Sequence, residues 1–249
     1  MAFNIIDSDI IKINDDLDLQ ISKIGETGHV VVTIDNFLKN PEDLVSIIEK
    51  YPIEKNDTST DNPNSMGYFP GWTTSFGIKA LEIRKTFNYI AKKYYDINFV
   101  ENLMYSTSIQ INLLNGGIPL SLKSLHPHTD PSILAFTLYL NKDEDCNGGT
   151  AFYKHVKSNI DYDVYMFDED FKKTEKSILI QKTKEKYNKP NLVSILDSRL
   201  IDDEWEKTFM VKMKYNRIVF HPGYMFHGAY IHKEWFQDKK RVSLAGFLK

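Results

Sequence analysis

The segment "SLHPHTDPS", residues 124–132, places two histidines and an aspartate within five residues. His128 and Asp130 are separated by one residue, and on an extended strand positions i and i+2 point to the same face. An imidazole nitrogen and a carboxylate oxygen could therefore converge on one point, and both are accepted ligands of divalent transition metals. The spacing predicts part of a metal site, although the pair alone is equally compatible with a structural role.

A third ligand would have to come from a distant strand. The segment "RIVFHPGYMFHGAY" offers His221 and His227. We favour His227, because it follows a Pro-Gly turn and precedes two small residues that leave room beside it. His221, at the end of the preceding strand, is the alternative. Two histidines and one carboxylate on one face leave three coordination positions open, which is typical of non-haem iron(II) oxygenases.

The remaining histidines receive simpler interpretations. His126 is expected beside the site or merely in a loop. His29, His155 and His232 are expected to be solvated or hydrogen-bonded within a core.

A possible anion site follows near the C-terminus, in "RVSLAGFL", where Arg241 and Ser243 again share a strand face. Arginine presents a planar fork of donors that matches a carboxylate, and serine adds one donor. A buried arginine needs such a partner. The alternative is that Arg241 ends the solvated basic run "QDKKR".

Composition limits the class of protein. The chain has 249 residues, 42% of them hydrophobic, which suits one domain spanning residues 1–249. The formal net charge of −3, without a basic block, predicts no nucleic-acid partner. The single cysteine excludes an internal disulfide and favours a reducing compartment. With no signal-like or membrane-length apolar run, we expect a cytoplasmic protein with no membrane partner.

The first hundred residues or so are expected to form a strand and helices. Residues 29–38 are β-branched and predict a strand. Helices are predicted from Pro41, after an Asn40 N-cap, and over residues 78–95, where apolar residues recur at helical spacing. Between them lies a polar loop over about residues 55–76 with the aromatic run "GYFPGWTT", either a lid or a loop held by buried aromatics.

From about residue 101 the chain changes to short β-branched or aromatic segments bounded by turn residues. These segments are "YSTSIQINLLNGG", "SILAFTLYLN", "GGTAFYKH", "TFMVKMKYN", "RIVFHP" and "RVSLAGFL". A helical insertion is expected over about residues 161–206. The pattern predicts an α+β, mainly β fold: a jelly roll (double-stranded β-helix) flanked by N-terminal helices.

From about residue 106 to its end, the sequence resembles the iron(II)/2-oxoglutarate-dependent oxygenases, and within them the prolyl-hydroxylase-like branch. The resemblance is carried by "HPHTD", "LYLNKDEDCNGGTAFY", "NRIVFHPGYMFH" and "RVSLAGF". It implies Fe(II) held by three ligands, 2-oxoglutarate as cosubstrate, and O2. Its metal ligands and catalytic residues would be His128, Asp130 and His227.

The resemblance also implies roles for other residues. Arg241, Ser243 and Tyr139 would bind 2-oxoglutarate, although Tyr139 equally fits an ordinary core aromatic. Thr150 and the two preceding glycines match a structural turn, and Arg217 is interpreted as a structural residue at a strand end. The implied activity is hydroxylation of an unactivated C–H bond of an amino acid, a peptidyl residue or a small metabolite, with release of succinate and CO2.

Two other readings compete with this one. A His-Asp-His site could hold zinc and activate water for hydrolysis. Alternatively, a jelly-roll scaffold could bind a ligand without turnover.

Overall fold

The computed structural model describes most of the chain. The described residues are 5–6, 12–50, 54–55, 72–75, 77–78, 81–97, 108–115, 120–121, 126–163, 170, 173–187, 192–193, 203–232, 235–236 and 239–248. This part of the chain is mainly β, with antiparallel sheets and three α-helices. None of its helices is long and apolar enough to cross a membrane.

The described part of the chain contains strands and helices in the following order. The strands are β1 (Ile5–Ile6), β2 (Asp18–Ile24), β3 (His29–Asp35), β4 (Glu54–Lys55), β5 (Trp72–Ser75), β6 (Gly77–Ile78), β7 (Ser108–Asn115), β8 (Leu120–Ser121), β9 (Leu134–Tyr139), β10 (Gly149–His155), β11 (Leu192–Val193), β12 (Trp205–Lys212), β13 (Ile218–Pro222), β14 (His227–Tyr230) and β15 (Lys240–Leu248). The α-helices are α1 (Pro41–Lys50), α2 (Leu81–Tyr95) and α4 (Glu175–Tyr187), with a short 3₁₀ helix over Asp143–Asp145.

The largest sheet has eight strands in the order β2-β3-β13-β9-β15-β7-β5-β4. Its central strand β13 is buried at all five positions, as expected for a strand covered on both faces. In β15, Ser243 lies opposite Tyr139 of β9. In β13, Val219 lies opposite Thr137 of β9. This register brings the inward-facing side chains of β9, β13 and β15 together.

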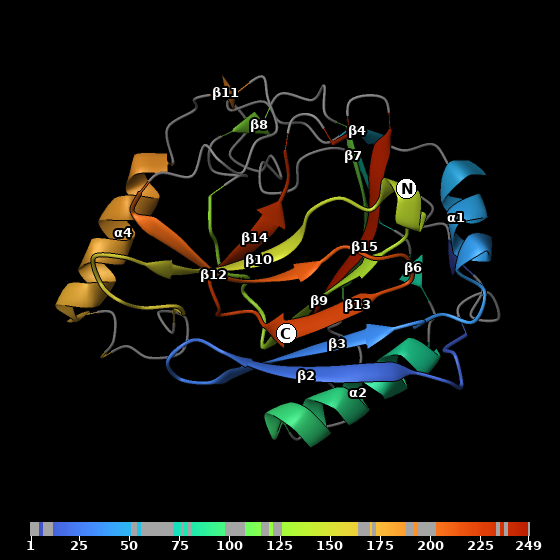
Figure 1. Ribbon diagram of the computed structural model, residues 1–249, viewed down its shortest axis with the longest axis horizontal. Helices are drawn as coiled ribbons and strands as arrows, with labels where there is room; N and C mark the ends of the chain where they lie inside the picture. The colour runs from blue at the N-terminus through green and yellow to red at the C-terminus, as the bar shows by residue number, and fades with distance from the viewer. Residues whose placement is uncertain are drawn as a thin grey trace.

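A three-stranded sheet in the order β12-β10-β14 lies over the large sheet (Figure 1). Apolar side chains from both sheets pack together between them, including Tyr139 and Val219 from the large sheet and Phe152 and Val211 from the small one. The two sheets therefore enclose a core in which a side chain from either sheet can reach the other.

Two further clusters cover the outer faces of the sheets. On α2, Phe87 and Ile90 pack against Val32 and Ile34 of β3, and Figure 1 shows α2 lying along β2 and β3. On the outer face of the small sheet, the cluster of Tyr153, Trp205 and Phe226 includes Ile180 of α4. Helix α2 is held by an apolar face, as is usual for amphipathic helices, whereas α4 contributes the single apolar residue Ile180 to its cluster.

Several of the observed strands lie where the sequence predicts them. The strands predicted from β-branched runs correspond to β3, β7, β9, β10, β12, β13 and β15. Strands β2 and β14 are not predicted by the sequence, nor are the short strands β1, β4, β5, β6, β8 and β11. Most of the aromatic loop over residues 55–76, including Tyr68 and Phe69, lies outside the described residues. Within residues 161–206 the structure describes α4 and β11.

Candidate metal centre

His128 and His227 are brought together by their own backbones. The amide of His128 donates to the carbonyl of His227, and the amide of His227 donates back, both at 2.9 Å. The two residues thus form an isolated antiparallel bridge. Directly opposed residues of such a pair project their side chains to the same side. The imidazole rings accordingly lie with their centroids 4.7 Å apart.

Asp130 is held on the same side by the turn that precedes β14. Its amide donates to the carbonyl of Gly223 at 2.8 Å, and its own carbonyl accepts from the amide of Ser132 at 2.7 Å. A Cβ at Gly223 would lie 2.2 Å from the Ser132 carbonyl oxygen. Only glycine allows the two backbones to approach this closely, so the Pro-Gly turn helps to place the carboxylate.

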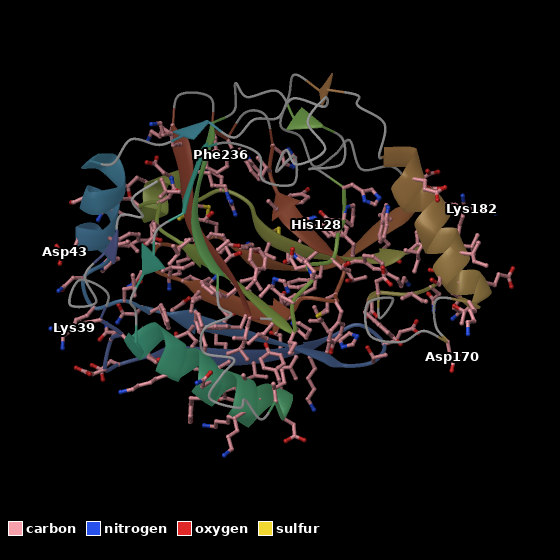
Figure 2. The ribbon with its side chains drawn as sticks, turned by 180° about the vertical axis from the view of Figure 1, so that it is seen from behind. Lys39, Asp43, His128, Asp170, Lys182 and Phe236 are labelled. Atoms are coloured by element: carbon pink, nitrogen blue, oxygen red, sulfur yellow. The ribbon has the colours of Figure 1, made fainter. Side chains whose placement is uncertain are left out.

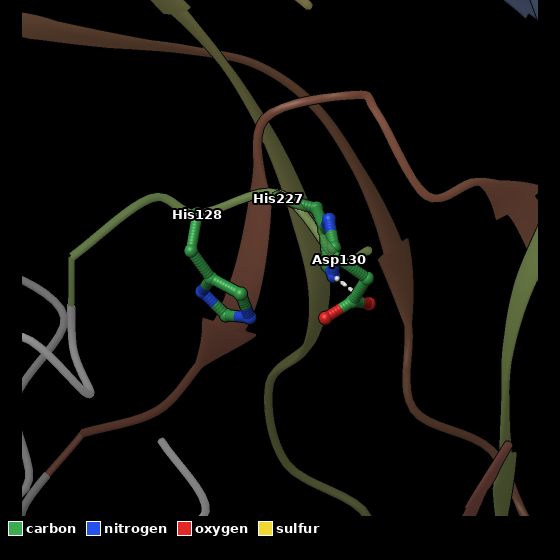
Figure 3. Close-up of side chains that lie close together, drawn as sticks. All are labelled: His128, Asp130 and His227. Atoms are coloured by element: carbon green, nitrogen blue, oxygen red, sulfur yellow. Dashed lines mark ion pairs between the residues drawn. The ribbon is translucent and has the colours of Figure 1, made fainter. Parts of the chain in front are cut away.

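The three side chains converge on one point (Figure 3). One ligand atom from each of His128, Asp130 and His227 lies within 4.8 Å of the other two. The Nε2 atom of His227 is 3.1 Å from Oδ2 of Asp130. Metal bonds of about 2.1 Å at right angles place two ligand atoms about 3 Å apart, so this separation suits two ligands of one ion.

Both histidines are oriented by hydrogen bonds from their Nδ1 atoms. The Nδ1 atom of His128 lies 3.2 Å from the carbonyl oxygen of His126. The Nδ1 atom of His227 lies 2.9 Å from the carbonyl oxygen of Met225. In each case Nδ1–H donates to the backbone two residues earlier, so Nε2 is the ring nitrogen that can bind a metal; in His227 this atom faces Asp130, to which it donates when the ring is protonated. Such bonds fix the tautomer that a metal-binding histidine requires.

The charges at the site favour a cation. Burial opposes ionisation of Asp130, but the charge and hydrogen bond of His227 outweigh it and lower the pKa of Asp130 to about 2. Burial alone would lower the pKa of His227, whereas the facing Asp130 carboxylate raises it. The carboxylate is therefore ionised near neutral pH, as a metal ligand must be.

Access to the site is from the side of His128, which is partly exposed, while Asp130 and His227 are buried. Figure 2 shows His128 within the outline of the molecule, whereas Lys39, Asp43, Asp170 and Lys182 project from its periphery.

His221, the alternative ligand, lies outside the group of three. Its ring is 4.3 Å from that of His227, and its Nδ1 atom is 3.0 Å from the carbonyl oxygen of Pro222. Burial lowers the pKa of His221 to about 3, so the ring is neutral.

Other histidines are held elsewhere. His29 faces Asp161, and His155 is bonded to Ser158; His232 stacks on Trp235.

Arg241 is buried near the centre of the large sheet, which contradicts the alternative that it ends a solvated basic run. It is 6% exposed, and its Nη1 donates to Oγ of Ser243 at 3.3 Å. Among the described residues no carboxylate acts on the pKa of Arg241, and its Nε has no hydrogen-bond partner. Burial lowers the pKa of Arg241. A guanidinium in this environment is a ready site for an anion.

Tyr139 packs beside the Arg241 guanidinium. The ring is fully buried, and the guanidinium carbon of Arg241 lies 5.4 Å from its centroid. The Tyr139 hydroxyl is 2.6 Å from Oγ1 of Thr150. Thr150 belongs to β10, so its side chain reaches across from the small sheet. The interpretation of Thr150 as a mere turn residue therefore missed this contact, because nothing in "GGTAF" shows which face the threonine occupies.

Arg217, in contrast, is fully paired. Its Nε and Nη2 donate to the two oxygens of Asp35, the second at 2.8 Å, and its Nη1 donates to the carbonyl of Lys212. The Nζ of Lys214 adds a third contact to Asp35 at 2.7 Å. This arrangement fits the interpretation of Arg217 as a structural residue.

Comparison with known proteins gives the family but no activity. The model of the DUF6445 family, described as a family of unknown function, matches residues 15–243, and the chain belongs to that family. No curated protein matches the sequence.

Among solved structures, one reported under the crystal structure of prolyl 4-hydroxylases from Phytophthora capsici is 12% identical, with a TM-score of 0.39. The similarity covers 88% of this chain and spans 58% of the length of that one.

Proposed function

We propose that the protein is an Fe(II)- and 2-oxoglutarate-dependent dioxygenase of the prolyl-hydroxylase-like branch. The proposed reaction is hydroxylation of a C–H bond of an amino acid, a peptidyl residue or a small metabolite, with release of succinate and CO2. Metal binding by His128, Asp130 and His227 is one part of the proposal. Binding of the dicarboxylic cosubstrate by Arg241, Ser243 and Tyr139 is the other.

The observation that carries the proposal is the buried guanidinium of Arg241, whose Nε has no hydrogen-bond partner among the described residues, within the same fold as the His-Asp-His group. A buried charge without a partner lowers the stability of the folded protein. Binding of an anion at this position would remove that loss of stability. A metal-activated hydrolase would need the triad but not this second, cationic pocket. A dicarboxylic keto acid uses both, because one end chelates a metal and the other end carries a free carboxylate.

The donor set fits Fe(II). Two imidazoles and one carboxylate on one side of an ion leave positions open for the cosubstrate and O2. When bound, iron and 2-oxoglutarate supply the oxidising chemistry, which the protein itself lacks. The contribution of the chain is to hold the two groups, to fix the imidazole tautomers through the carbonyls of His126 and Met225, and to exclude water with the apolar side chains between the sheets.

The strand order supports a jelly roll. Within the large sheet the order β13-β9-β15-β7 pairs strands that are distant in the sequence, and β12-β10-β14 forms the opposing layer. The bridge between His128 and His227 adds a fourth segment to that layer. Four antiparallel segments facing four others are what a double-stranded β-helix requires. We propose that the whole chain forms one such domain.

The test is reconstitution of the metal-free protein with Fe(II) and 2-oxoglutarate in the absence of O2. We expect a visible charge-transfer absorption band that needs both components, followed by succinate formation when O2 is admitted. Zinc in place of iron should give neither. A folded protein that binds zinc tightly but shows no band with Fe(II) and 2-oxoglutarate would overturn the proposal in favour of a hydrolytic site.

A further inference from the structure

Trp205, the first residue of β12, contacts both segments that carry the histidine ligands. The side chain is buried, with 7% of the residue exposed. Its ring lies edge-on to that of His126, at 5.0 Å and 85°, and to that of Phe226, at 4.8 Å and 68°. One indole thus touches one residue just before His128 and another just before His227.

Both contacted residues determine how the ligands are placed. The carbonyl of His126 accepts the hydrogen bond from Nδ1 of His128. Phe226 directly precedes His227, and its backbone is bonded on both sides: its amide to the carbonyl of Asp161 at 3.0 Å, and its carbonyl to the amide of Tyr153 at 2.9 Å. Each ring that Trp205 contacts thus belongs to a residue joined to a ligand, by a hydrogen bond in His126 and by a peptide bond in Phe226.

The strand pairing around Trp205 fixes the position of its backbone. Trp205 lies opposite His155 in the pairing of β12 with β10, and the two rings are 5.1 Å apart. His155 is fully buried and bonded to Oγ of Ser158 at 2.8 Å. The carbonyl of Glu204 accepts from the amide of Val156 at 2.9 Å. The indole is therefore anchored to β10, the strand that also pairs with β14 and its His227.

We propose that Trp205 is a positioning residue of the metal centre: by packing against His126 and Phe226 it helps to hold the two bridged segments so that the His128 and His227 rings keep their orientation. The inference rests on metal binding by the triad, which is one part of the proposed function, and is independent of 2-oxoglutarate.

The packing of the ring, rather than a polar contact, carries this role. The buried Nε1 atom of Trp205 has no hydrogen-bond partner within the described part of the chain. Phenylalanine would keep an aromatic ring between His126 and Phe226, whereas leucine would keep apolar volume but lose the flat surface. The two substitutions therefore separate positioning from simple burial.

The experiment uses the full chain stripped of metal, titrated calorimetrically with Mn²⁺ as an air-stable probe of the site, and with Co²⁺ for its absorption spectrum. We expect Trp205→Leu to weaken Mn²⁺ binding about 10–100-fold and to change the Co²⁺ spectrum, because loss of supporting groups around ligands has effects of this size. Trp205→Phe should remain within about threefold of the parent protein.

A matched control is Phe87→Leu, since Phe87 is equally buried but packs between α2 and the large sheet. This variant should melt at a lower temperature with unchanged Mn²⁺ affinity. If metal affinity falls equally in Phe87→Leu, the effect of Trp205 is only one of stability and the inference is wrong. An unchanged affinity and Co²⁺ spectrum in Trp205→Leu would overturn it as well.

A second pair of variants covers the case in which Trp205→Leu does not fold. His126→Ala removes one partner of the indole and leaves the His126 carbonyl in place, so it should also weaken Mn²⁺ binding several-fold. Trp205→Phe, which keeps an aromatic ring in place, should again stay within about threefold of the parent protein. Wild-type affinity in His126→Ala contradicts the inference. Absence of Mn²⁺ binding in the parent protein would overturn the metal site itself.

Discussion

Two arginines near Tyr139 experience opposite environments. Arg217 donates two hydrogen bonds to Asp35 and a third to the backbone carbonyl of Lys212. Arg241 is more deeply buried, yet among the described residues its neighbours are the neutral groups of Ser243, Tyr139 and Cys146 rather than a carboxylate. A paired charge can be part of the scaffold, whereas an unpaired one lowers stability until a partner arrives. The difference separates a structural arginine from one that is available to a ligand.

The same contrast applies to the carboxylates. Asp35 is surrounded by the cations of Arg217 and Lys214, so its charge is neutralised within the protein. Asp130 faces imidazoles whose Nε2 atoms carry lone pairs when the rings are neutral. Asp130 and Arg241 thus differ from Asp35 and Arg217 in having no opposite side-chain charge from Lys, Arg, Asp or Glu beside them among the described residues.

The largest effect is expected from removing the metal ligands. Without them, a cosubstrate held at Arg241 would have no metal to react with. His128→Ala or Asp130→Ala should reduce iron-dependent succinate formation to background, because neither remaining pair can hold Fe(II) in an open three-ligand site. The metal-free proteins should retain a cooperative thermal transition. His232→Ala, which alters a histidine stacked on Trp235, is the control. An unchanged succinate yield in either ligand variant rules out the assignment.

The next test compares substitutions of the two arginines. Arg241→Ala should raise the 2-oxoglutarate concentration needed for half-maximal turnover about 10–100-fold, because a charge-assisted bidentate contact contributes roughly 1.5–3 kcal/mol. Arg241→Lys should lie between, since it keeps the charge but loses the fork. Arg217→Ala should lower the melting temperature and leave the 2-oxoglutarate requirement unchanged. If Arg241→Ala and Arg217→Ala show the same 2-oxoglutarate requirement and the same melting temperature, the two arginines do not differ in role.

The paired arginine gives a pH-dependent prediction of stability. The hydrogen bond from Arg217, against the opposing effect of burial, lowers the pKa of Asp35 in the folded protein. A lowered folded pKa means that the ionised carboxylate stabilises the protein above the unfolded value, about 3.9, and that this contribution is lost as the pH falls through the folded pKa.

Asp35→Asn should therefore unfold with a free energy about 1.5–3 kcal/mol lower at pH 7, and the difference from the parent protein should shrink below about pH 4. Denaturant titrations at pH 7 and at steps below pH 4 measure both. A difference that stays constant over this range would show that Asp35 contributes through packing rather than charge.

Part of the site could be predicted from local pattern alone. The one-residue spacing of His128 and Asp130 places two side chains on one face of any extended segment, whatever the rest of the fold. The β-branched runs that became β9, β13 and β15 are buried on both faces, and such strands have a composition that is visible in the sequence.

The rest depended on tertiary neighbours. Strand β14 is only four residues long, "HGAY", and two of these are small residues without strand preference. In β15, Lys240 is exposed and Arg241 is buried, a difference that the basic run "QDKKR" hides because it depends on which face meets the other sheet. The contact of Thr150 with Tyr139 joins strands of different sheets, so no sequence separation or periodicity indicates it.

The smallest effect tests whether the anion pocket extends to the small sheet. Tyr139→Phe should weaken 2-oxoglutarate binding to the Mn²⁺-loaded protein about 2–12-fold, because one neutral hydrogen bond contributes about 0.5–1.5 kcal/mol. Thr150→Val should have a similar effect by removing the hydroxyl that fixes the Tyr139 proton, whereas Thr150→Ser should restore binding. Calorimetric titration measures all three. If the double variant Tyr139→Phe/Thr150→Val binds no more weakly than Tyr139→Phe alone, Thr150 acts through Tyr139. If the two effects add fully, Thr150 has its own contact with the ligand, and the pocket of Arg241 is formed by both sheets independently.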